Sequence, residues 1–122
     1  MPFPFEKFVL YQKSIIWMRE AQTICRLAKH RMPHNLVDQL FRASASIPLN
    51  VAEGCGKWME KDRRNFYRMA RGSVFECVPI LQIFTTSHII SKAQYEKSYA
   101  LLEEIGKMLT AIIKKTESIP DR

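Results

Sequence analysis

The chain has 122 residues, enough to bury one hydrophobic core but not two, so we expect a single domain over residues 1–122. Hydrophobic residues make up 47% and charged residues 25%, the usual mix of a soluble globular protein. The formal net charge of +7 favours polyanionic partners, above all nucleic acid.

No apolar run approaches the roughly 20 residues that a membrane helix needs, and the first residues lack the basic and apolar regions of a signal peptide. We therefore expect a cytoplasmic protein without a membrane partner. The three cysteines form no C-x-x-C pair and are expected to be reduced, mostly buried thiols.

The first segment with helical periodicity runs from about residue 5 to 31 and ends before Pro33, because a residue that precedes proline is pushed out of the helical region. Its apolar stripe follows a spacing of three and four residues. The stripe consists of Phe8, Tyr11, Ile15, Met18, Gln22 and Cys25, with Trp17, Ile24 and Leu27 beside it.

The second helical segment begins near Asn35 and ends at Gly54 and Gly56. Its apolar residues are Val37, Leu40, Phe41, Ile47 and Val51. Pro48 lies inside this segment, where we expect a kink rather than a break.

The third segment opens near Glu60 or Asp62, acidic residues that suit a helix N-terminus, and closes around residues 85–88. Pro79 is a second internal proline, and again we expect a kink. The apolar stripe consists of Phe66, Ala70, Ser73, Cys77, Ile80 or Leu81, and Phe84.

Ser91 and Gln94 form a capping-box pattern that starts a fourth helix. One face of that helix carries Leu102, Ile105, Leu109 and Ile112, with Leu101 and Met108 adjoining. Four long helices with short connections predict an all-α, antiparallel up-down-up-down four-helix bundle. Gly72 and Gly106 lie within helices, which predicts close backbone approach where helices cross.

Two polar stripes flank the apolar ones. On the second helix the stripe is Arg42, Ser46, Asn50, Glu53 and Lys57, and on the third it is Lys61, Arg64, Arg68 and Arg71. We expect Arg42 and Arg71 to pair with Glu53 or Glu76 across helices, in a structural polar network that includes Asn50.

The remaining basic residues admit two interpretations. Lys57, Lys61, Arg64 and Arg68 either bind nucleic-acid phosphates or are simply solvated. Three aromatic residues nearby would be available for base stacking in the first case: Trp58, Phe66 and Tyr67.

Two sequence runs, residues 46–57 (SIPLNVAEGCGK) and 66–76 (FYRMARGSVFE), resemble the signature of the four-helix-bundle family encoded in intervening sequences of 23S ribosomal RNA genes. Residues 11–13 and 104–109 agree with the same family, so the resemblance covers nearly the whole chain. It implies a left-handed bundle that assembles as a ring-like homo-oligomer, typically a pentamer. The family is similar in fold to the accessory proteins of diversity-generating retroelements, which bind nucleic acid and a reverse transcriptase.

The chain departs from the family pattern at Cys55, where an aromatic residue is common, and at Pro79, where a helix former is more usual. No established enzymatic activity comes with the resemblance.

Catalytic and metal sites find no support in the sequence. Residues 54–57 end like a phosphate-binding loop, but the required upstream glycine is missing and Trp58 replaces the required Ser or Thr. His30 and His34 are four residues apart, yet Pro33 breaks the helix that would align them. We expect no enzyme, no metal and no cofactor.

Two functions from different classes therefore stand. The first is an oligomer that binds nucleic acid, RNA or DNA, and the family's association with ribosomal RNA genes favours RNA. The second is a protein-interaction scaffold whose partner is a reverse transcriptase or another protein. A small-molecule enzyme is a distant third.

The sequence also predicts self-association. The first and fourth helices carry more apolar residues than one stripe requires, and several exposed apolar residues along one helix usually mark an interface. Together with the resemblance, this predicts a homo-oligomer, a pentamer by count, with these two helices prominent in the contacts.

Overall fold

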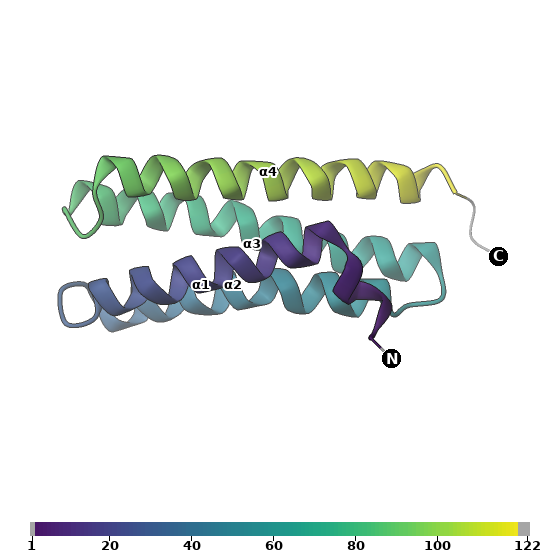
Figure 1. Cartoon of the computed structure of the whole chain (residues 1–122), viewed down its shortest axis with the longest axis horizontal. Helices are drawn as coiled ribbons and strands as arrows, with labels where there is room; N and C mark the ends of the chain where they lie inside the picture. The colour runs from purple at the N-terminus through teal and green to yellow at the C-terminus, as the bar shows by residue number, and fades with distance from the viewer. Residues whose placement is uncertain (1, 120–122) are drawn as a thin grey trace.

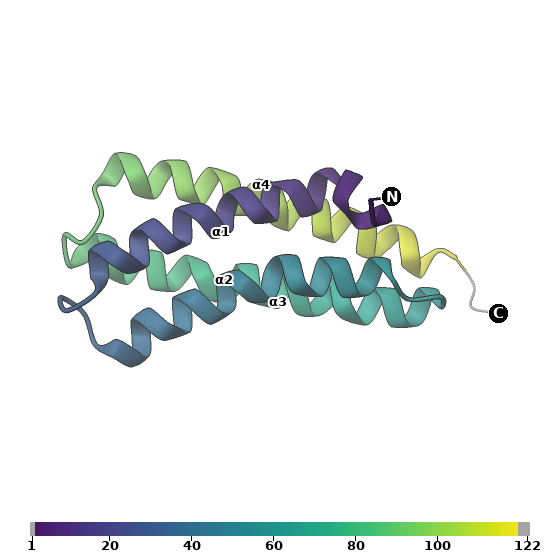
Figure 2. The same cartoon turned by 60° about the horizontal axis from the view of Figure 1, so that its bottom comes forward.

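The structure is a computed structural model that describes residues 2–119. After a short 3-10 turn, η1 (Pro4–Lys7), four helices follow: α1 (Val9–Ala28), α2 (His34–Cys55), α3 (Glu60–Thr86) and α4 (Lys92–Glu117). Consecutive helices run in opposite directions and lie side by side as one elongated bundle (Figures 1 and 2). The described residues contain no strand. The predicted four-helix bundle is confirmed.

The helix boundaries differ most at the two ends of α1. The first turn predicted from residue 5 is the separate turn η1, and Phe8 has extended backbone (φ −72°, ψ 119°) before α1 begins. At the other end Lys29 is also extended and His30 has φ 69°, so the helix ends three residues earlier than predicted. α2 continues through Pro48 and α3 continues through Pro79. Neither proline ends its helix, as expected.

The core stripe of α1 is one residue earlier than predicted. The residues of α1 that are buried are Leu10, Ser14, Trp17, Ala21, Ile24 and Ala28. Both stripes have the same spacing of three and four, and each contains apolar residues, so periodicity alone could not choose between two faces about 100° apart. The predicted stripe lies along the edge of the core, where Gln22 is exposed.

The other helices follow their predicted stripes more closely. Leu102, Ile105 and Leu109 are fully buried on α4, with Ile113 in place of the predicted Ile112. On α2, Leu40, Ile47 and Val51 are fully buried, whereas Phe41 is 42% exposed. On α3 the buried residues include Ala70, Cys77, Ile80, Leu81 and Phe84.

A small polar cluster lies within the apolar core. The indole Nε1 of Trp17 donates to Ser44 Oγ over 3.1 Å, and Ser44 Oγ lies 3.6 Å from Cys77 Sγ. These contacts join α1, α2 and α3 at one level of the bundle. Within residues 2–119 no buried side-chain nitrogen or oxygen lacks a hydrogen-bond partner.

The caps of α3 and α4 explain the turn between them. Ser91 accepts a hydrogen bond from the Gln94 backbone N–H over 3.1 Å, which confirms it as the N-cap of α4. α3 ends in a Schellman motif, in which Ile89 N donates to Phe84 O and His88 N donates to Thr85 O. His88 occupies the left-handed position of that motif, with φ 60°.

No described helix is both long enough and apolar enough to span a bilayer.

Candidate nucleic-acid interface

The basic stripe predicted on α3 is partly used to hold the bundle together. Arg64 Nη1 donates to the backbone carbonyl of Thr116 over 3.1 Å, and Arg68 Nη2 pairs with the Glu117 carboxylate over 2.7 Å. Both contacts tie the start of α3 to the end of α4. Arg64 is half-buried in this contact. These two arginines therefore have a structural role within the chain, and the Glu117 carboxylate partly neutralises the charge of Arg68.

The two lysines of the predicted site lie nearer the α2–α3 connection. Lys57 is half-buried, and its ammonium group lies 5.1 Å from the centre of the Phe66 ring, a cation–π contact between the connection and α3. Lys61 is exposed in the first turn of α3. The connection is anchored by Arg63, whose Nε donates to the Lys57 carbonyl over 2.7 Å.

Of the three aromatic residues proposed for stacking, one is presented to solvent. Trp58 lies in the connection and is 95% exposed, the largest exposed fraction among the large hydrophobic side chains described. Tyr67 is buried in the core, so the expectation that it is available for stacking is wrong. Phe66 is half-buried beneath Lys57. The structure thus presents one exposed indole, which directly follows Lys57 and precedes Lys61 by three residues.

The predicted polar network does not form within the chain. Arg42 pairs with Asp38 on its own helix over 3.1 Å, and Arg71 donates to Thr110 Oγ1 over 2.9 Å. Glu76 accepts from Gln39 over 3.0 Å. Glu53 is exposed and reaches neither arginine. The expectation of a buried Glu53 is wrong because its position is on the outer side of α2.

Apart from the Gln39–Glu76 hydrogen bond, the side-chain hydrogen bonds described between α2 and α3 are neutral. Asn50 Nδ2 donates to the carbonyl and hydroxyl oxygens of Ser46, each over 2.8 Å, and Ser73 Oγ donates to Ser46 Oγ over 2.9 Å. Short hydroxyl side chains thus hold the α2–α3 register where charged residues were expected.

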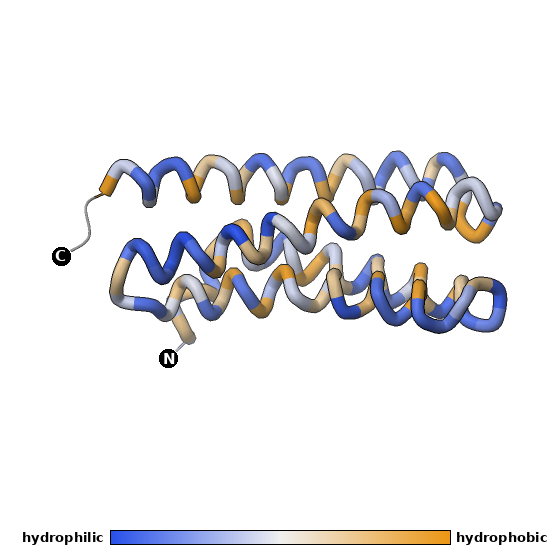
Figure 3. Tube along the Cα trace, turned by 180° about the vertical axis from the view of Figure 1, so that it is seen from behind, coloured by the Kyte–Doolittle hydropathy of each residue, from blue (hydrophilic) through white to orange (hydrophobic). Residues whose placement is uncertain are grey.

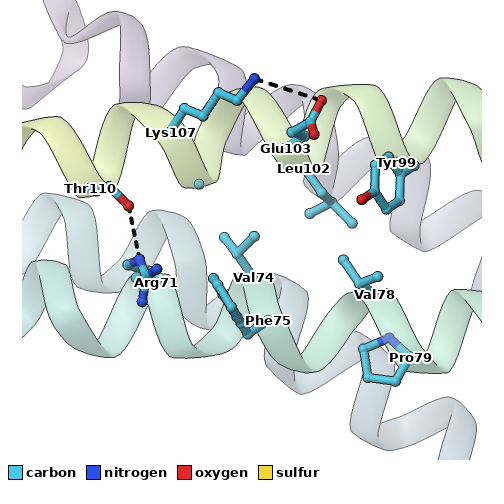
Figure 4. Close-up of a pocket in the computed structure, with 11 residues that line it drawn as sticks. Arg71, Val74, Phe75, Val78, Pro79, Tyr99, Leu102, Glu103, Lys107 and Thr110 are labelled. Atoms are coloured by element: carbon cyan, nitrogen blue, oxygen red, sulfur yellow. Dashed lines mark hydrogen bonds and ion pairs between the residues drawn. The ribbon is translucent and has the colours of Figure 1, made fainter.

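A groove of about 460 Å³ separates α3 from α4 (Figure 4). Its walls are apolar, and its rim carries the Arg71–Thr110 hydrogen bond and an ion pair between Lys107 and Glu103 at 4.0 Å. Gly106 forms part of the lining. The lining holds no histidine, cysteine or serine, the residue types that most often carry nucleophilic or general-base chemistry.

Exposed apolar side chains gather on the outward side of α3 beside this groove. We call this surface the α3 outer face; it consists of Met69, Gly72, Phe75, Pro79 and Ile83. α3 changes from hydrophilic near its start to hydrophobic toward its end (Figure 3). A side chain added at Gly72 would meet nothing within 4 Å, so the expected close helix crossing there is absent from the chain itself.

The apolar excess predicted on α1 has a different explanation. Trp17 and Ile24 are fully buried in the core, so they offer nothing to another subunit. The exposed members of α1 are separated along the helix, at Val9, Ile16 and Leu27. The sequence pattern did not predict the α3 outer face, because two of its five residues, Gly72 and Pro79, are only weakly hydrophobic.

The fold and these surfaces define an all-helical bundle protein with basic ends and an exposed apolar helix face. A sequence profile of the 23S rRNA-intervening sequence protein family matches residues 6–111, and the chain belongs to that family. The chain is also similar to a 1.70 Å crystal structure from Bacteroides thetaiotaomicron, described as a protein with unknown function from the S23 ribosomal protein family. That match has a TM-score of 0.81 at 23% identity and covers 86% of this chain and 98% of the other. No curated protein matches the chain.

Proposed function

We propose that this protein is a non-enzymatic, oligomeric nucleic-acid-binding protein, with RNA as its ligand, acting in the cytoplasm. The observation that carries the proposal is Trp58 of the α2–α3 connection, whose indole is 95% exposed and which stands in sequence between Lys57 of the connection and Lys61 of the first turn of α3. An exposed aromatic ring next to cationic side chains is the arrangement on which bases stack while phosphates are neutralised. The net charge of +7 supports a polyanionic ligand.

The binding surface consists of Trp58, Lys57 and Lys61, with Arg64 and Arg68 behind them. Because Arg64 and Arg68 bond to α4, their part is to hold the surface and raise its potential rather than to grip phosphate directly. This division of roles revises the four equal phosphate ligands expected from the sequence.

The proposal includes self-association through the α3 outer face. Five apolar or small residues follow one side of α3, and the Arg71 guanidinium lies at its edge, 4.4 Å from the centre of the Phe75 ring. Such a face is unusual for a helix in contact with water and is typical of an interface. We propose a homo-oligomer, a pentamer by the family resemblance, in which each subunit contributes one copy of the Trp58 surface.

A protein partner is the second candidate, and the same face favours it. In that case the α3 outer face and the adjoining groove would dock another protein, such as a reverse transcriptase. The oligomeric mass of the purified protein separates the two candidates, because a monomer leaves the face available for a foreign partner.

The test of RNA binding is fluorescence anisotropy with a labelled single-stranded RNA at low salt and neutral pH. Trp58→Ala is expected to weaken binding by about 1–3 kcal/mol, the usual contribution of one stacked base. Phe41→Ala removes another exposed ring, in the first half of α2, and serves as the matched control. Equal affinity of Trp58→Ala and the parent would overturn the assignment of this surface.

A further inference from the structure

The opposite end of the bundle carries a second basic surface. There the α1–α2 connection and the α3–α4 connection come together, and Arg31 Nη2 reaches the His88 carbonyl oxygen at 3.5 Å (Figures 1 and 2). We call this end the loop pole; its residues are Arg26, Lys29, His30, Arg31, His34, His88 and Lys92, all exposed.

Carboxylates are absent from the segments that build the loop pole. Residues 21–37 and 77–95 contain no Asp or Glu, while they carry four Lys or Arg residues and all three histidines of the chain. The α2–α3 end differs, because there Glu60 and Glu117 pair with arginines. The loop pole is therefore the end whose positive charge is least neutralised.

The carboxylates nearest to the loop pole are mostly occupied. Asp38 lies one turn after His34 on α2 and lines the same groove, but it pairs with Arg42 over 3.1 Å. Glu20 on α1 pairs with Lys97 of α4 over 3.5 Å. Glu96 on α4 is exposed and lies one turn beyond Lys92. The remaining charged groups around the imidazoles are cations.

Two of the three histidines stand where glycine would be easier to accommodate. His30 has φ 69° and His88 has φ 60°, in the left-handed region that favours Gly and Asn. Both side chains are exposed, so packing in the core does not explain an imidazole at either position.

We propose that the loop pole is a second nucleic-acid-binding surface, which contacts the phosphate backbone through its arginine, lysine and histidine side chains and binds it more tightly in mild acid. This inference depends on the proposed function for one point only, which is that the ligand is RNA. Protonation adds up to three charges to a surface that already carries four, and phosphate binding favours the protonated imidazoles in return.

The two surfaces lie at opposite ends of a long molecule. α3 has 27 residues and joins one end to the other, which corresponds to about 40 Å at 1.5 Å per residue. One subunit can therefore contact two separate stretches of RNA, one through Trp58 at any pH and one through the loop pole mainly in mild acid.

The experiment compares binding of a labelled single-stranded RNA at pH of about 7.5 and about 5.5. We expect the parent to bind roughly tenfold tighter at the lower pH, with the log–log salt slope steeper by about 0.7 for each imidazole engaged. His30→Gly/His88→Gly is expected to lose most of that gain.

The glycine substitutions separate binding from folding. Glycine fits the left-handed backbone at both positions, so the double variant is expected to melt at the same temperature as the parent or higher. Lys114→Gln/Lys115→Gln, in the last turn of α4 at the other end, is the matched control. It is expected to weaken binding by the same factor at both pH values.

The outcomes distinguish this inference from the proposed function. The loop-pole proposal is overturned if the parent binds equally at both pH values, or if the double variant keeps the full gain in affinity. Neither result affects the proposal that RNA binds at the Trp58 surface. Binding seen only in mild acid and lost in the double variant supports the loop pole while overturning the Trp58 surface. No binding at either pH overturns both.

Discussion

The ring of Tyr67 occupies the space in which a side chain at residue 54 would begin. A Cβ placed on Gly54 would lie 2.8 Å from Tyr67 Cε1 and 3.1 Å from Tyr67 Cδ1. Both residues are buried, Gly54 in the last turns of α2 and Tyr67 in the first half of α3. The absence of a side chain thus lets α2 and α3 pack closely beside the connection that carries Trp58.

Gly54→Ala is therefore expected to destabilise the protein by about 1–3 kcal/mol, the usual effect of overpacking a core. Gly56→Ala is the control, because a Cβ there would lie 3.6 Å from its nearest neighbour, an ordinary contact. Urea unfolding of the two variants measures the difference. Equal midpoints for Gly54→Ala and the parent would show that the Tyr67 ring moves aside freely.

The Trp17–Ser44 hydrogen bond makes a second prediction about stability. Ser44→Ala leaves the buried indole N–H of Trp17 without its acceptor, which is expected to cost about 1–3 kcal/mol. Glu53→Ala, at an exposed position, is expected to change the free energy of unfolding by less than about 0.5 kcal/mol. A larger effect for Glu53→Ala than for Ser44→Ala in thermal unfolding would contradict the described core.

Periodicity and proline positions were sufficient to predict four helices and their order. They did not identify the buried face of α1, because apolar residues occur on two neighbouring faces and only packing against α2 and α4 selects one. Trp17 illustrates this. Its buried indole N–H needs a hydrogen-bond acceptor, and the acceptor is Ser44 of a different helix.

The candidate site was predictable in part. Lys57, Trp58 and Lys61 were found from charge and aromatic spacing, but the partners of Arg64 and Arg68 come from α4, about 50 residues away in sequence. Charged residues on α2 and α3 were expected to pair with one another, whereas helix rotation directs Arg71 toward α4 and Glu53 toward solvent. Only tertiary packing sets that rotation.

The buried thiol of Cys77 gives a third prediction, on pH dependence. Burial raises its pKa from 9.0 to about 11, an effect that the Ser44 and Trp17 hydrogen bonds partly offset. Below pH 9 the thiol is protonated in both states, and above it the unfolded thiol loses its proton first. Stability is therefore expected to fall between pH 9 and 11, by at most about 1.4 kcal/mol per pH unit from this thiol.

Urea unfolding across that pH range checks this expectation, with Cys77→Ala as the comparison. Burial also raises the pKa of Cys25 to about 11, so part of the slope should persist in the variant. A parent curve that is no steeper than the variant curve would mean that the Cys77 thiol ionises as readily in the folded protein as in the unfolded chain.

The fourth prediction concerns assembly through the α3 outer face. Ile83, on that face, is 43% exposed, and Ile83→Lys is expected to reduce the oligomer to monomers because it places a charge in an apolar contact. Ile16→Lys, at a similarly exposed position on α1, is expected to leave the mass unchanged. Light scattering coupled to gel filtration reports both masses. Dissociation by Ile16→Lys alone would move the interface to α1, and a monomeric parent would remove self-association altogether.

The central claim is that this chain binds RNA through charge and stacking, and the salt dependence of RNA binding tests it most directly. Anisotropy titrations of the parent between about 50 and 200 mM salt are expected to show tight binding at the low end and steep weakening, since each neutralised phosphate releases counterions. Lys57→Gln/Lys61→Gln is expected to flatten that slope by about 1.4, or roughly 0.7 for each lysine. Absence of binding at the lowest salt, or a slope that the double variant leaves unchanged, would contradict the account.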